Sequence, residues 1–504
     1  MARNLLYFRQ QRRWRQRIGL SALLSSLLLV MCIAPAYADT NTTSAQVKVN
    51  LRQVLSTISP LALGVNAAVW DSNLLDAQVP GLLRADGVRV MRYPGGSTAD
   101  AFHWQTNTLD NGSSAGLDTF DQFMQVVQKV GATPIITVNY GTGTPEEAAA
   151  WVKYANLTKH YHIRYWEIGN ELYGNGTYGA NWESDKHAQG PAAYATNSLQ
   201  FIQAMKAADP FIQIGLVLTA PGNWPDGQTS ASSPQPWNDT VLSSTCSAAD
   251  FVAIHWYPQG PTGESDAGLL AAPANGESTS VSYTPSIPSM VSTLHGELNQ
   301  YCGTRASQIK IMATETNSVS YNPGKQTTNL VNALYLAENY LTWLANGVTN
   351  VDWWDVHNSI MTGDNNSPDL YGTNNFGDYG MLSVGNTGEP PAETPFPAYY
   401  GLQIVSKVVQ GFGQVVAVSS SQSLVQAFAV RQRDGSIAVL LVNTDPNTTY
   451  TVSLSGFHTE GGAAVYTYGE NSSAVSVTYQ HGNAASSQTI TPYSLTAVVF
   501  HSED

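Results

Sequence analysis

The chain has 504 residues, of which 43% are hydrophobic, 10% aromatic and 12% charged, with 42 glycines and 25 prolines. This composition is typical of a loop-rich globular protein and excludes a disordered one, and the length suffices for a large barrel with a companion domain. The formal net charge of −14 makes nucleic acid and anionic membranes poor partners, whereas a neutral polymer is indifferent to it.

Residues 1–38 have the pattern of a secretory signal peptide. A basic segment with six arginines precedes the apolar run IGLSALLSSLLLVMCIA, and the sequence AYA offers a cleavage site before Asp39. We therefore expect a secreted protein, extracellular or periplasmic, with no membrane association after cleavage. The alternative is a retained anchor, but the apolar run is short for a spanning helix. Lipid attachment at Cys32 is disfavoured because the large Met31 precedes it.

Two cysteines, Cys246 and Cys302, remain after the predicted cleavage. In an oxidising compartment they would be able to pair, but two buried free thiols fit the sequence equally well. No spacing of cysteine and histidine resembles a zinc site, so the sequence predicts neither a metal nor a cofactor.

Residues 39–60 contain an alternating segment that would add a strand to a later sheet. From residue 61 to 410, short apolar runs alternate with amphipathic helical patterns. We count eight such runs: residues 61–69, 87–93, 133–140, 163–170, 211–219, 250–257, 308–315 and 347–356. Near-continuous apolar strands that alternate with helices predict a parallel sheet closed into a (β/α)8 TIM barrel.

The connections between these runs differ in length. Those leading into a strand are short, such as GA, DP and NG, whereas four that leave a strand are long: residues 172–190, 220–238, 258–288 and 357–397. The long loops would all lie at the carboxyl ends of the strands, where barrels of this kind hold their active sites. A deep cleft with loop walls is therefore expected there.

Residues 411–504 change to a period of two broken by turns, and the sequence RDGS is a hairpin signal. This segment predicts a C-terminal antiparallel β-sandwich. The predicted fold is therefore an α/β protein, a barrel followed by a sandwich that packs against it.

Two glutamates end predicted strands on opposite sides of the barrel. Glu171 follows the fourth strand in the sequence GNE, and Glu315 ends the seventh in ATE. A single glutamate after a strand is usually a solvated loop residue, but two that face across one mouth suit glycosidic cleavage. In that reaction one carboxyl protonates the leaving oxygen while the other attacks the anomeric carbon.

Three motifs in order resemble glycoside hydrolases of clan A, and within it the α-L-arabinofuranosidases of family 51. They are VMRYPGGSTADAFHW, VNYGTGTPEEAAAWVKYAN and RYWEIGNELYG, which together cover roughly residues 85–175. The resemblance implies that Glu171 is the general acid/base and Glu315 the nucleophile. It also implies that Asn170 hydrogen-bonds the 2-hydroxyl of the sugar, and that Arg92 keeps Glu315 ionised. A purely structural ion pair is the alternative for Arg92.

The sixth and eighth predicted strands supply further candidates. In HWY, strand alternation places His255 and Tyr257 on one side and Trp256 on the other. The clan often has a tyrosine there that bonds the nucleophile, and Tyr257 matches it, although a buried core tyrosine would look the same. Of Trp353 and Trp354, one is expected in the core and the other as a sugar platform; we select Trp354 as substrate-binding.

The sequence departs from the family at three places. The first strand usually ends with a carboxylate that grips the furanose, whereas here Asn66 is the polar candidate for substrate binding. Ser97 replaces the usual asparagine after the glycines, and the nucleophile segment lacks the usual tryptophan. These departures leave the catalytic pair in place but put the identity of the sugar in doubt.

The sequence predicts a secreted retaining glycoside hydrolase that acts on plant or microbial polysaccharide or oligosaccharide, with an α-L-arabinofuranosidase-like specificity. Two alternatives stay open. One is a hydrolase of the same clan that acts on another sugar, such as a uronide, xyloside or galactofuranoside. The other is a carbohydrate-binding barrel without activity, against which the intact pair of Glu171 and Glu315 argues.

Overall fold

The computed structural model describes residues 42–231, 233–278, 283–363, 365–458 and 461–501. The predicted signal peptide, residues 1–38, and Cys32 lie outside this part of the chain. Within it, no helix combines the length and the apolar character that a membrane span requires.

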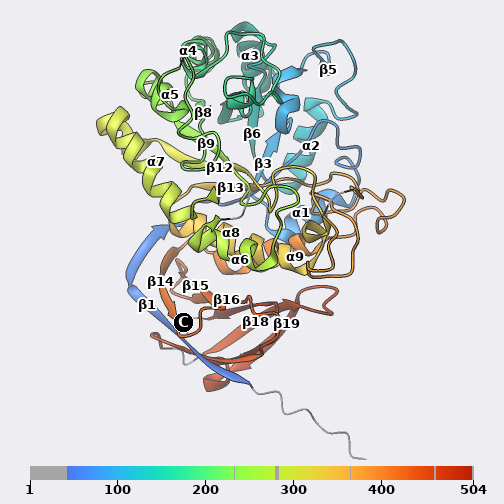
Figure 1. The fold of residues 1–504 in the computed structure, drawn as a ribbon, viewed down its shortest axis with the longest axis vertical. Helices are drawn as coiled ribbons and strands as arrows, with labels where there is room; N and C mark the ends of the chain where they lie inside the picture. The colour runs from blue at the N-terminus through green and yellow to red at the C-terminus, as the bar shows by residue number, and fades with distance from the viewer. Residues whose placement is uncertain (1–41, 232, 279–282, 364, 459–460, 502–504) are drawn as a thin grey trace, which may run out of the picture. The chain divides into compact units, whose positions relative to one another are not determined.

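Eight parallel strands close into a barrel, as the sequence predicts (Figure 1). The neighbours around the ring are in the order β12, β13, β2, β3, β6, β7, β8 and β9. In chain order the strands are β2 (Leu63–Asn66), β3 (Val90–Tyr93), β6 (Thr133–Val138), β7 (Tyr165–Ile168), β8 (Gln213–Val217), β9 (Phe251–Trp256), β12 (Lys310–Thr316) and β13 (Asn350–Trp353). Together with the second sheet described below, this confirms the predicted fold class.

The barrel interior has an apolar layer below a polar one. Alternate residues of a strand point the same way, so the inward residue of one layer is followed two positions later by that of the next. The lower layer is an apolar cluster that includes Val90, Tyr165 and Met312. Two residues further along the same strands come Arg92, Glu167 and Thr314, and Glu167 accepts hydrogen bonds from the other two. The polar layer lies at the carboxyl ends of the strands, where it supports the candidate site.

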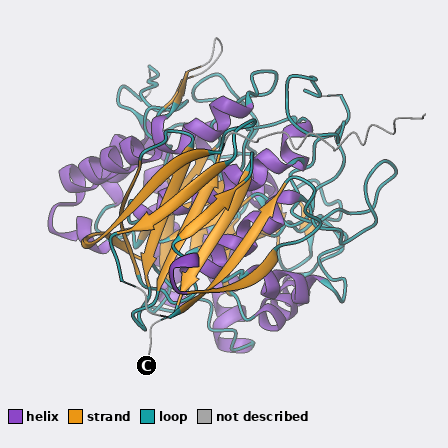
Figure 2. Ribbon diagram, turned by 90° about the horizontal axis from the view of Figure 1, so that it is seen from below, coloured by secondary structure: helices purple, strands orange, loops and turns teal. Residues whose placement is uncertain are grey.

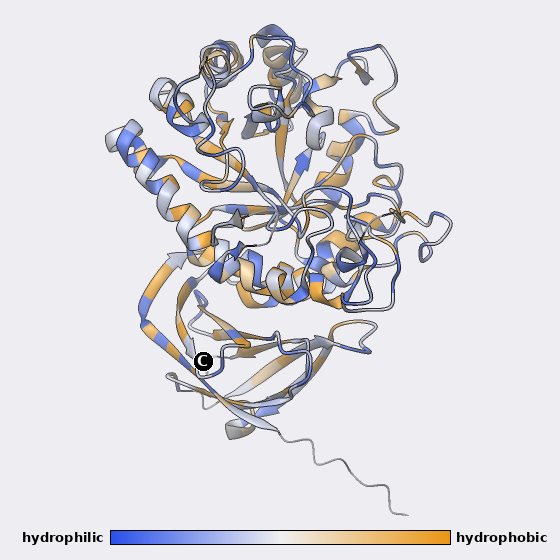
Figure 3. Ribbon diagram, viewed as in Figure 1, coloured by the Kyte–Doolittle hydropathy of each residue, from blue (hydrophilic) through white to orange (hydrophobic). Residues whose placement is uncertain are grey.

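Nine helices of the described residues surround the barrel strands or cover the second sheet. They are α1 (Val79–Asp86), α2 (Phe120–Val130), α3 (Pro145–Val152), α4 (Pro191–Ala208), α5 (Trp237–Thr245), α6 (Asp266–Asn275), α7 (Ile287–Cys302), α8 (Leu330–Ala345) and α9 (Pro397–Val409). Hydrophobic and hydrophilic residues alternate along α7 in Figure 3, the pattern of a helix that packs on one side only. Helix α8 is instead buried along almost its entire length.

Several helix starts are specified locally by the sequence. The Thr119 side chain accepts from the backbone of Gln122, and the Gln122 side chain accepts from Thr119, which forms a capping box before α2. At the start of α3 the Thr144 side chain accepts from the backbone N of Glu147, and proline occupies the first helical position. Two small hairpins decorate the loops: β4 (Phe102–His103) with β5 (Thr108–Leu109), and β10 (Glu277–Ser278) with β11 (Tyr283–Thr284).

The second sheet has nine strands, mostly antiparallel, and Figure 2 shows them side by side. They are β1 (Thr43–Thr57), β14 (Gln414–Ser420), β15 (Val425–Arg431), β16 (Ile437–Asn443), β17 (Tyr450–Ser455), β18 (Gly462–Gly469), β19 (Ser476–His481), β20 (Ser487–Ile490) and β21 (Ser494–Phe500). The turn signal RDGS joins β15 to β16 as a hairpin in which Arg431 faces Ile437. Inward residues of these strands form an apolar core of their own.

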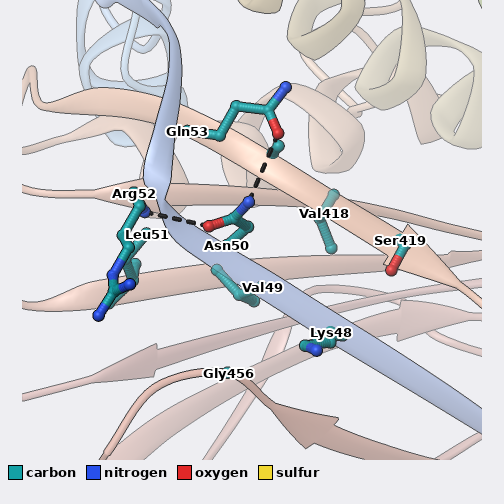
Figure 4. A pocket seen from close by; sticks show the side chains of 10 residues that line it. Lys48, Val49, Asn50, Leu51, Arg52, Gln53, Val418, Ser419 and Gly456 are labelled. Atoms are coloured by element: carbon teal, nitrogen blue, oxygen red, sulfur yellow. Dashed lines mark hydrogen bonds between the residues drawn. The ribbon is translucent and has the colours of Figure 1, made fainter.

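The N-terminal strand β1 joins this sheet, pairing antiparallel with β14 and parallel with β17. Its register with β14 shifts after Asn50, and a shallow hollow lies beside the shift. Figure 4 shows the local contacts there: the Arg52 backbone N donates to Asn50 at 3.2 Å, and Asn50 donates to Gln53 at 3.4 Å. The irregularity lets the long strand β1 bend while it pairs with β14 on one side and β17 on the other.

Barrel and second sheet share a hydrophobic core, because α9 packs against β16 and β21. The predicted boundaries at residues 60 and 410 stay predictions. A disulfide joins Cys246, just after α5, to Cys302 at the end of α7. Of the two states that the sequence left open for these cysteines, the structure has the paired one.

Candidate active site

Glu171 and Glu315 meet at the mouth of the barrel although 144 residues separate them in the sequence. Glu171 follows β7 in a left-handed backbone conformation, with φ of 40°. Glu315 is the next-to-last residue of β12, whose register with both neighbouring strands shifts between Ala313 and the end of the strand. One oxygen of each carboxylate and one nitrogen of His255 all lie within 4.8 Å of one another.

Glu315 receives hydrogen bonds on both carboxylate oxygens. The Tyr257 hydroxyl donates to Oε1 at 2.6 Å, as the family resemblance implies, and the Arg92 guanidinium donates to Oε2 at 3.2 Å. Burial raises the pKa of Glu315, and the charge of Glu171 adds to this, while His255, Arg92 and Tyr257 lower it; the net direction is upward. Arg92 thus acts on Glu315 in the expected sense without outweighing the burial of the carboxyl.

Glu171 is also held from two sides. His255 Nδ1 lies 2.9 Å from one oxygen, and the indole N–H of Trp182 donates to the other at 2.9 Å. Burial alone would raise the pKa of Glu171, but the hydrogen bonds and the charge of His255, helped by Trp182, lower it overall. Burial would lower the pKa of His255, yet Glu315 and Glu171 raise it.

These three groups are close enough to share protons, so each pKa belongs to the cluster rather than to one residue. The lowered pKa of Glu171 favours its ionised form, and the raised pKa of His255 favours its protonated form. The 2.9 Å contact between His255 Nδ1 and Glu171 joins these two groups, so a proton is able to pass between them when substrate binding changes their surroundings. The arrangement can supply one proton and one anionic carboxylate to a bound molecule.

Arg92 links the polar residues beneath the mouth. Its side chain is fully buried and donates to Glu167 at 2.6 Å, Asn66 at 2.9 Å, Asn170 at 2.8 Å and Glu315. Burial lowers the pKa of Arg92, but Glu167 and Glu315 outweigh it and raise the pKa above its usual value. Arg92 is therefore a permanent cation, and the alternative of a structural ion pair applies to its contact with Glu167.

Glu167 is a site residue that the sequence analysis missed. Besides Arg92, it accepts hydrogen bonds from Thr137 at 2.8 Å and Thr314 at 3.1 Å, and it is completely buried. The available signal was an acidic residue in the middle of the apolar strand YWEI, because a charge in such a place needs a partner.

Asn170 is oriented by three partners. Its side-chain oxygen accepts from Arg92, its Nδ2 donates to Glu183 at 2.9 Å, and its backbone N donates to Asp100 at 2.8 Å. Only one of the two amide hydrogens of Asn170 is used by Glu183, so the second one is available to the 2-hydroxyl that the resemblance assigns to it.

Glu183 and Asp100 were also missed by the sequence analysis. Glu183 accepts from Ser97, the residue at which the chain departs from the family, and its second oxygen is buried without a hydrogen-bond partner. Burial raises the pKa of Glu183, and it raises that of Asp100 to about 8. Both carboxyls therefore bind protons more readily than usual, and both hold Asn170 in place by hydrogen bonds.

Asn66 lies buried in the polar layer beneath the mouth. Its side chain is buried, its nitrogen donates to the carbonyl oxygens of Thr314 and Trp353, and its oxygen accepts from Arg92. In this structure Asn66 supports Arg92, because both ends of its amide are hydrogen-bonded within the polar layer, and its predicted contact with sugar stays a prediction.

The tryptophans divide as the sequence predicts. Trp353 is completely buried, whereas Trp354 is half-buried beside Gly96. Of the loop aromatics, Trp182 and Trp224 are exposed, but Trp237 is buried at the start of α5. The half-buried Tyr371 packs against Tyr493, which directly precedes β21.

Among the described residues, Glu171, His255 and Glu315 form the one group of three side chains spaced to hold a metal ion. Their atoms are engaged by one another and by Tyr257 and Arg92, which is the arrangement expected of an acid and nucleophile pair. We assign no ion to them, and the absence of a metal stays a prediction from the sequence.

Fold and site together define a (β/α)8 barrel protein with two facing carboxylates after its fourth and seventh strands. This is the arrangement of the clan A glycoside hydrolases that the three motifs resemble. The comparisons with known proteins confirm this resemblance and connect the chain to α-L-arabinofuranosidases. No family model matches the chain.

Two curated relatives illustrate the sequence similarity. The probable alpha-L-arabinofuranosidase C of Aspergillus fumigatus is 29% identical over 220 residues, which are 38% of this chain and 42% of the relative. An intracellular exo-alpha-(1->5)-L-arabinofuranosidase of Streptomyces lividans is 26% identical over 232 residues, 40% of this chain and 33% of the relative. The chain thus spans less than half the length of the relatives that it matches.

Solved structures show the fold over nearly the whole chain. The alpha-L-arabinofuranosidase of Thermotoga maritima, in its arabinose complex, has a TM-score of 0.66 at 18% identity and covers 90% of this chain and 99% of its own. A family 44 xyloglucanase of Paenibacillus polymyxa has a TM-score of 0.65 at 12% identity, covering 92% and 100%. Identities this low show the shared fold alone.

Proposed function

We propose that this protein is a retaining glycoside hydrolase with Glu171 as general acid/base and Glu315 as nucleophile. The observation that carries the proposal is the approach of the two carboxylates, whose nearest oxygens lie within 4.8 Å. Retaining enzymes hold their carboxyl groups about 5 to 5.5 Å apart, and inverting enzymes about 6.5 to 9.5 Å apart, to leave room for water. The short separation supports direct attack by Glu315.

In the first step the ionised Glu315 attacks the anomeric carbon and the bond to the leaving oxygen breaks. Glu171, protonated through its hydrogen bond with His255, gives its proton to that oxygen. Arg92 and Tyr257 hold the two oxygens of Glu315, so the attacking carboxylate is fixed before substrate arrives. Asn170, clamped between Arg92 and Glu183, presents its free amide hydrogen to the 2-hydroxyl.

In the second step Glu171 is a carboxylate and acts as a base. It takes a proton from water, whose oxygen attacks the same anomeric carbon, and Glu315 leaves as a carboxylate. Tyr257 and Arg92 stabilise the negative charge that returns to Glu315. Two displacements at one carbon restore its configuration, and the sum of the steps is hydrolysis.

We propose an α-L-arabinofuranoside as the sugar that is cleaved. The support is the names of relatives such as the alpha-L-arabinofuranosidase C of Emericella nidulans and the exo-alpha-(1->5)-L-arabinofuranosidase of Streptomyces lividans. The main observation against this sugar is Asn66. It occupies the position of the family's usual carboxylate, and its side chain is hydrogen-bonded to buried protein groups. A same-clan hydrolase of a different sugar is therefore the second candidate.

A panel of aryl furanosides and pyranosides tests both proposals, with nuclear magnetic resonance of the first-formed product. We expect cleavage of the aryl α-L-arabinofuranoside with retention, and labelling of the peptide that contains IMATETNS by a mechanism-based inhibitor. Cleavage of a different aryl glycoside alone would reject the sugar and keep the mechanism. Inversion, or labelling away from Glu315, would reject the mechanism, and no turnover would leave a carbohydrate-binding barrel.

We also propose that the protein is secreted. The Cys246–Cys302 disulfide supports an oxidising compartment, where such bonds persist. The predicted signal peptide, residues 1–38, would direct the chain to export. Mass spectrometry of protein exported by a bacterial host should give an N-terminus at Asp39, and retention of the whole chain in the cytoplasm would contradict export.

A further inference from the structure

Two pairs of tryptophan rings flank the carboxylates at the mouth of the barrel. Trp182 and Trp224 come from the loops after β7 and β8, with ring centroids 5.3 Å apart and planes inclined by 50°. Trp70 and Trp354 come from the loops after β2 and β13, with centroids 6.4 Å apart and planes inclined by 62°. Trp182, Trp224 and Trp70 are 43%, 45% and 38% exposed.

The strand order puts the two pairs on opposite sides of the mouth. Around the closed ring of eight strands, β7 is four positions from β13, and β8 is four positions from β2. Four positions in a ring of eight is the full diameter. The pair after β7 and β8 therefore faces the pair after β13 and β2 across the opening.

Each pair adjoins one of the two carboxylates. Trp182 donates to Glu171, so its ring is fixed next to the residue that protonates the leaving group. The Trp354 backbone N donates at 3.0 Å to the carbonyl of Thr316, which follows Glu315. One pair is thus anchored beside the proposed acid/base, and the other is anchored to the strand that carries the proposed nucleophile.

We propose that the mouth binds a linear polysaccharide with at least two sugar units on each side of the cleaved bond, so that the enzyme cuts chains internally. This inference rests on the proposed hydrolase function and adds the substrate class. Exposed aromatic faces stack on the apolar faces of sugar rings, and the inclination within each pair suits neighbouring units that are rotated relative to each other.

Hydrolysis of the polymer itself tests the proposal. Linear 1,5-arabinan, xylan and xyloglucan are digested separately while viscosity and reducing ends are followed. Internal cleavage consumes one water per bond, lowers the viscosity early and yields oligosaccharides of two or more units from at least one polymer. Release of monosaccharide as the sole product, with viscosity falling only late, would overturn the inference while leaving the proposed hydrolase function intact.

Variants of the rings test their part in binding. Trp224→Ala and Trp70→Ala should each lower the ratio of kcat/KM on the polymer to kcat/KM on an aryl glycoside at least tenfold, and Trp224→Phe should retain most of it. Phe211→Ala is the matched control, because this 86% exposed ring lies on the short connection before β8, at the other end of the barrel. Ratios equal to that of the control would overturn the role of the rings.

Affinity gels separate failure of the inference from failure of the proposed function. If no aryl glycoside and no polymer is cleaved, the hydrolase proposal fails. Electrophoresis through gels that contain each of the three polymers then tests whether the tryptophan pairs bind polysaccharide. Retardation of the wild type by one polymer, lost in Trp224→Ala and kept in Phe211→Ala, would support polysaccharide binding at the tryptophan pairs. Equal migration in all the gels would overturn it.

Discussion

Replacing Tyr257 by phenylalanine removes a single hydrogen bond from the proposed nucleophile. The 2.6 Å bond joins the tyrosine hydroxyl to a buried carboxylate, and hydrogen bonds to charged groups contribute about 1.5 to 3 kcal/mol. In the second step Glu315 leaves as a carboxylate, so the lost bond falls on the transition state of that step. A loss of about 2 kcal/mol slows the breakdown of the glycosyl-enzyme by about 30-fold.

The same change has a consequence for pH dependence. Tyr257 lowers the pKa of Glu315, so its removal raises that pKa further above the usual value. Glu315 must be ionised to attack, and the acid limb of kcat/KM should therefore move to higher pH, by up to about 1.5 units for 2 kcal/mol. The acid limb moves upward because Glu315 of the free enzyme is protonated more easily without the tyrosine hydroxyl.

Stopped-flow kinetics on a dinitrophenyl glycoside, together with a pH profile of kcat/KM, measure both effects. We expect a burst of dinitrophenol, because the intermediate accumulates when its breakdown is slow. Tyr154→Phe is the control: it removes a 2.9 Å hydrogen bond to Asp121, another carboxylate, far from the mouth. If kcat stays within threefold of the wild type and the acid limb does not move, the proposed contact with the nucleophile is wrong.

Three further outcomes follow from the structure. Glu171→Ala should lose about 10²- to 10⁴-fold on poor leaving groups, spare the first step on activated aryl glycosides and respond to azide; equal loss on both, without rescue, would reject its role. Cys246→Ser should lower the unfolding free energy in urea by about 4 kcal/mol, because the disulfide closes a loop of 56 residues, and an unchanged midpoint would contradict this. His357 lies 2.8 Å from Asp71 and 3.2 Å from Glu393; burial lowers its pKa, but these carboxylates raise it to about 10. Its stabilisation is complete below about pH 6.5 and is lost as the pH rises through 10, so His357→Gln should destabilise by about 4 kcal/mol at pH 6 and progressively less towards pH 10; a deficit that grows with pH would refute this.

The sequence by itself determined the architecture of the barrel. Parallel strands covered on both faces are largely apolar, so all eight appear as near-continuous apolar runs that alternate with helical patterns. The turn residues RDGS fixed the hairpin between Arg431 and Ile437 for a similarly local reason, since glycine accepts the positive φ of the turn. Glu171 and Glu315 were found because strand ends meet at one mouth in a closed barrel.

Only the tertiary structure decided how the polar residues pair. Glu167 looks like an isolated acid in a buried strand until barrel closure brings Arg92, Thr137 and Thr314 to it. Closure likewise turned Asn66 inward, because its amide satisfies buried carbonyls that no local residue reaches. Side chains from separate strands share neither a periodicity nor a spacing in the sequence. Their contacts arise from the geometry of the closed ring, which is why the sequence identified the two carboxylates but not the network that holds them.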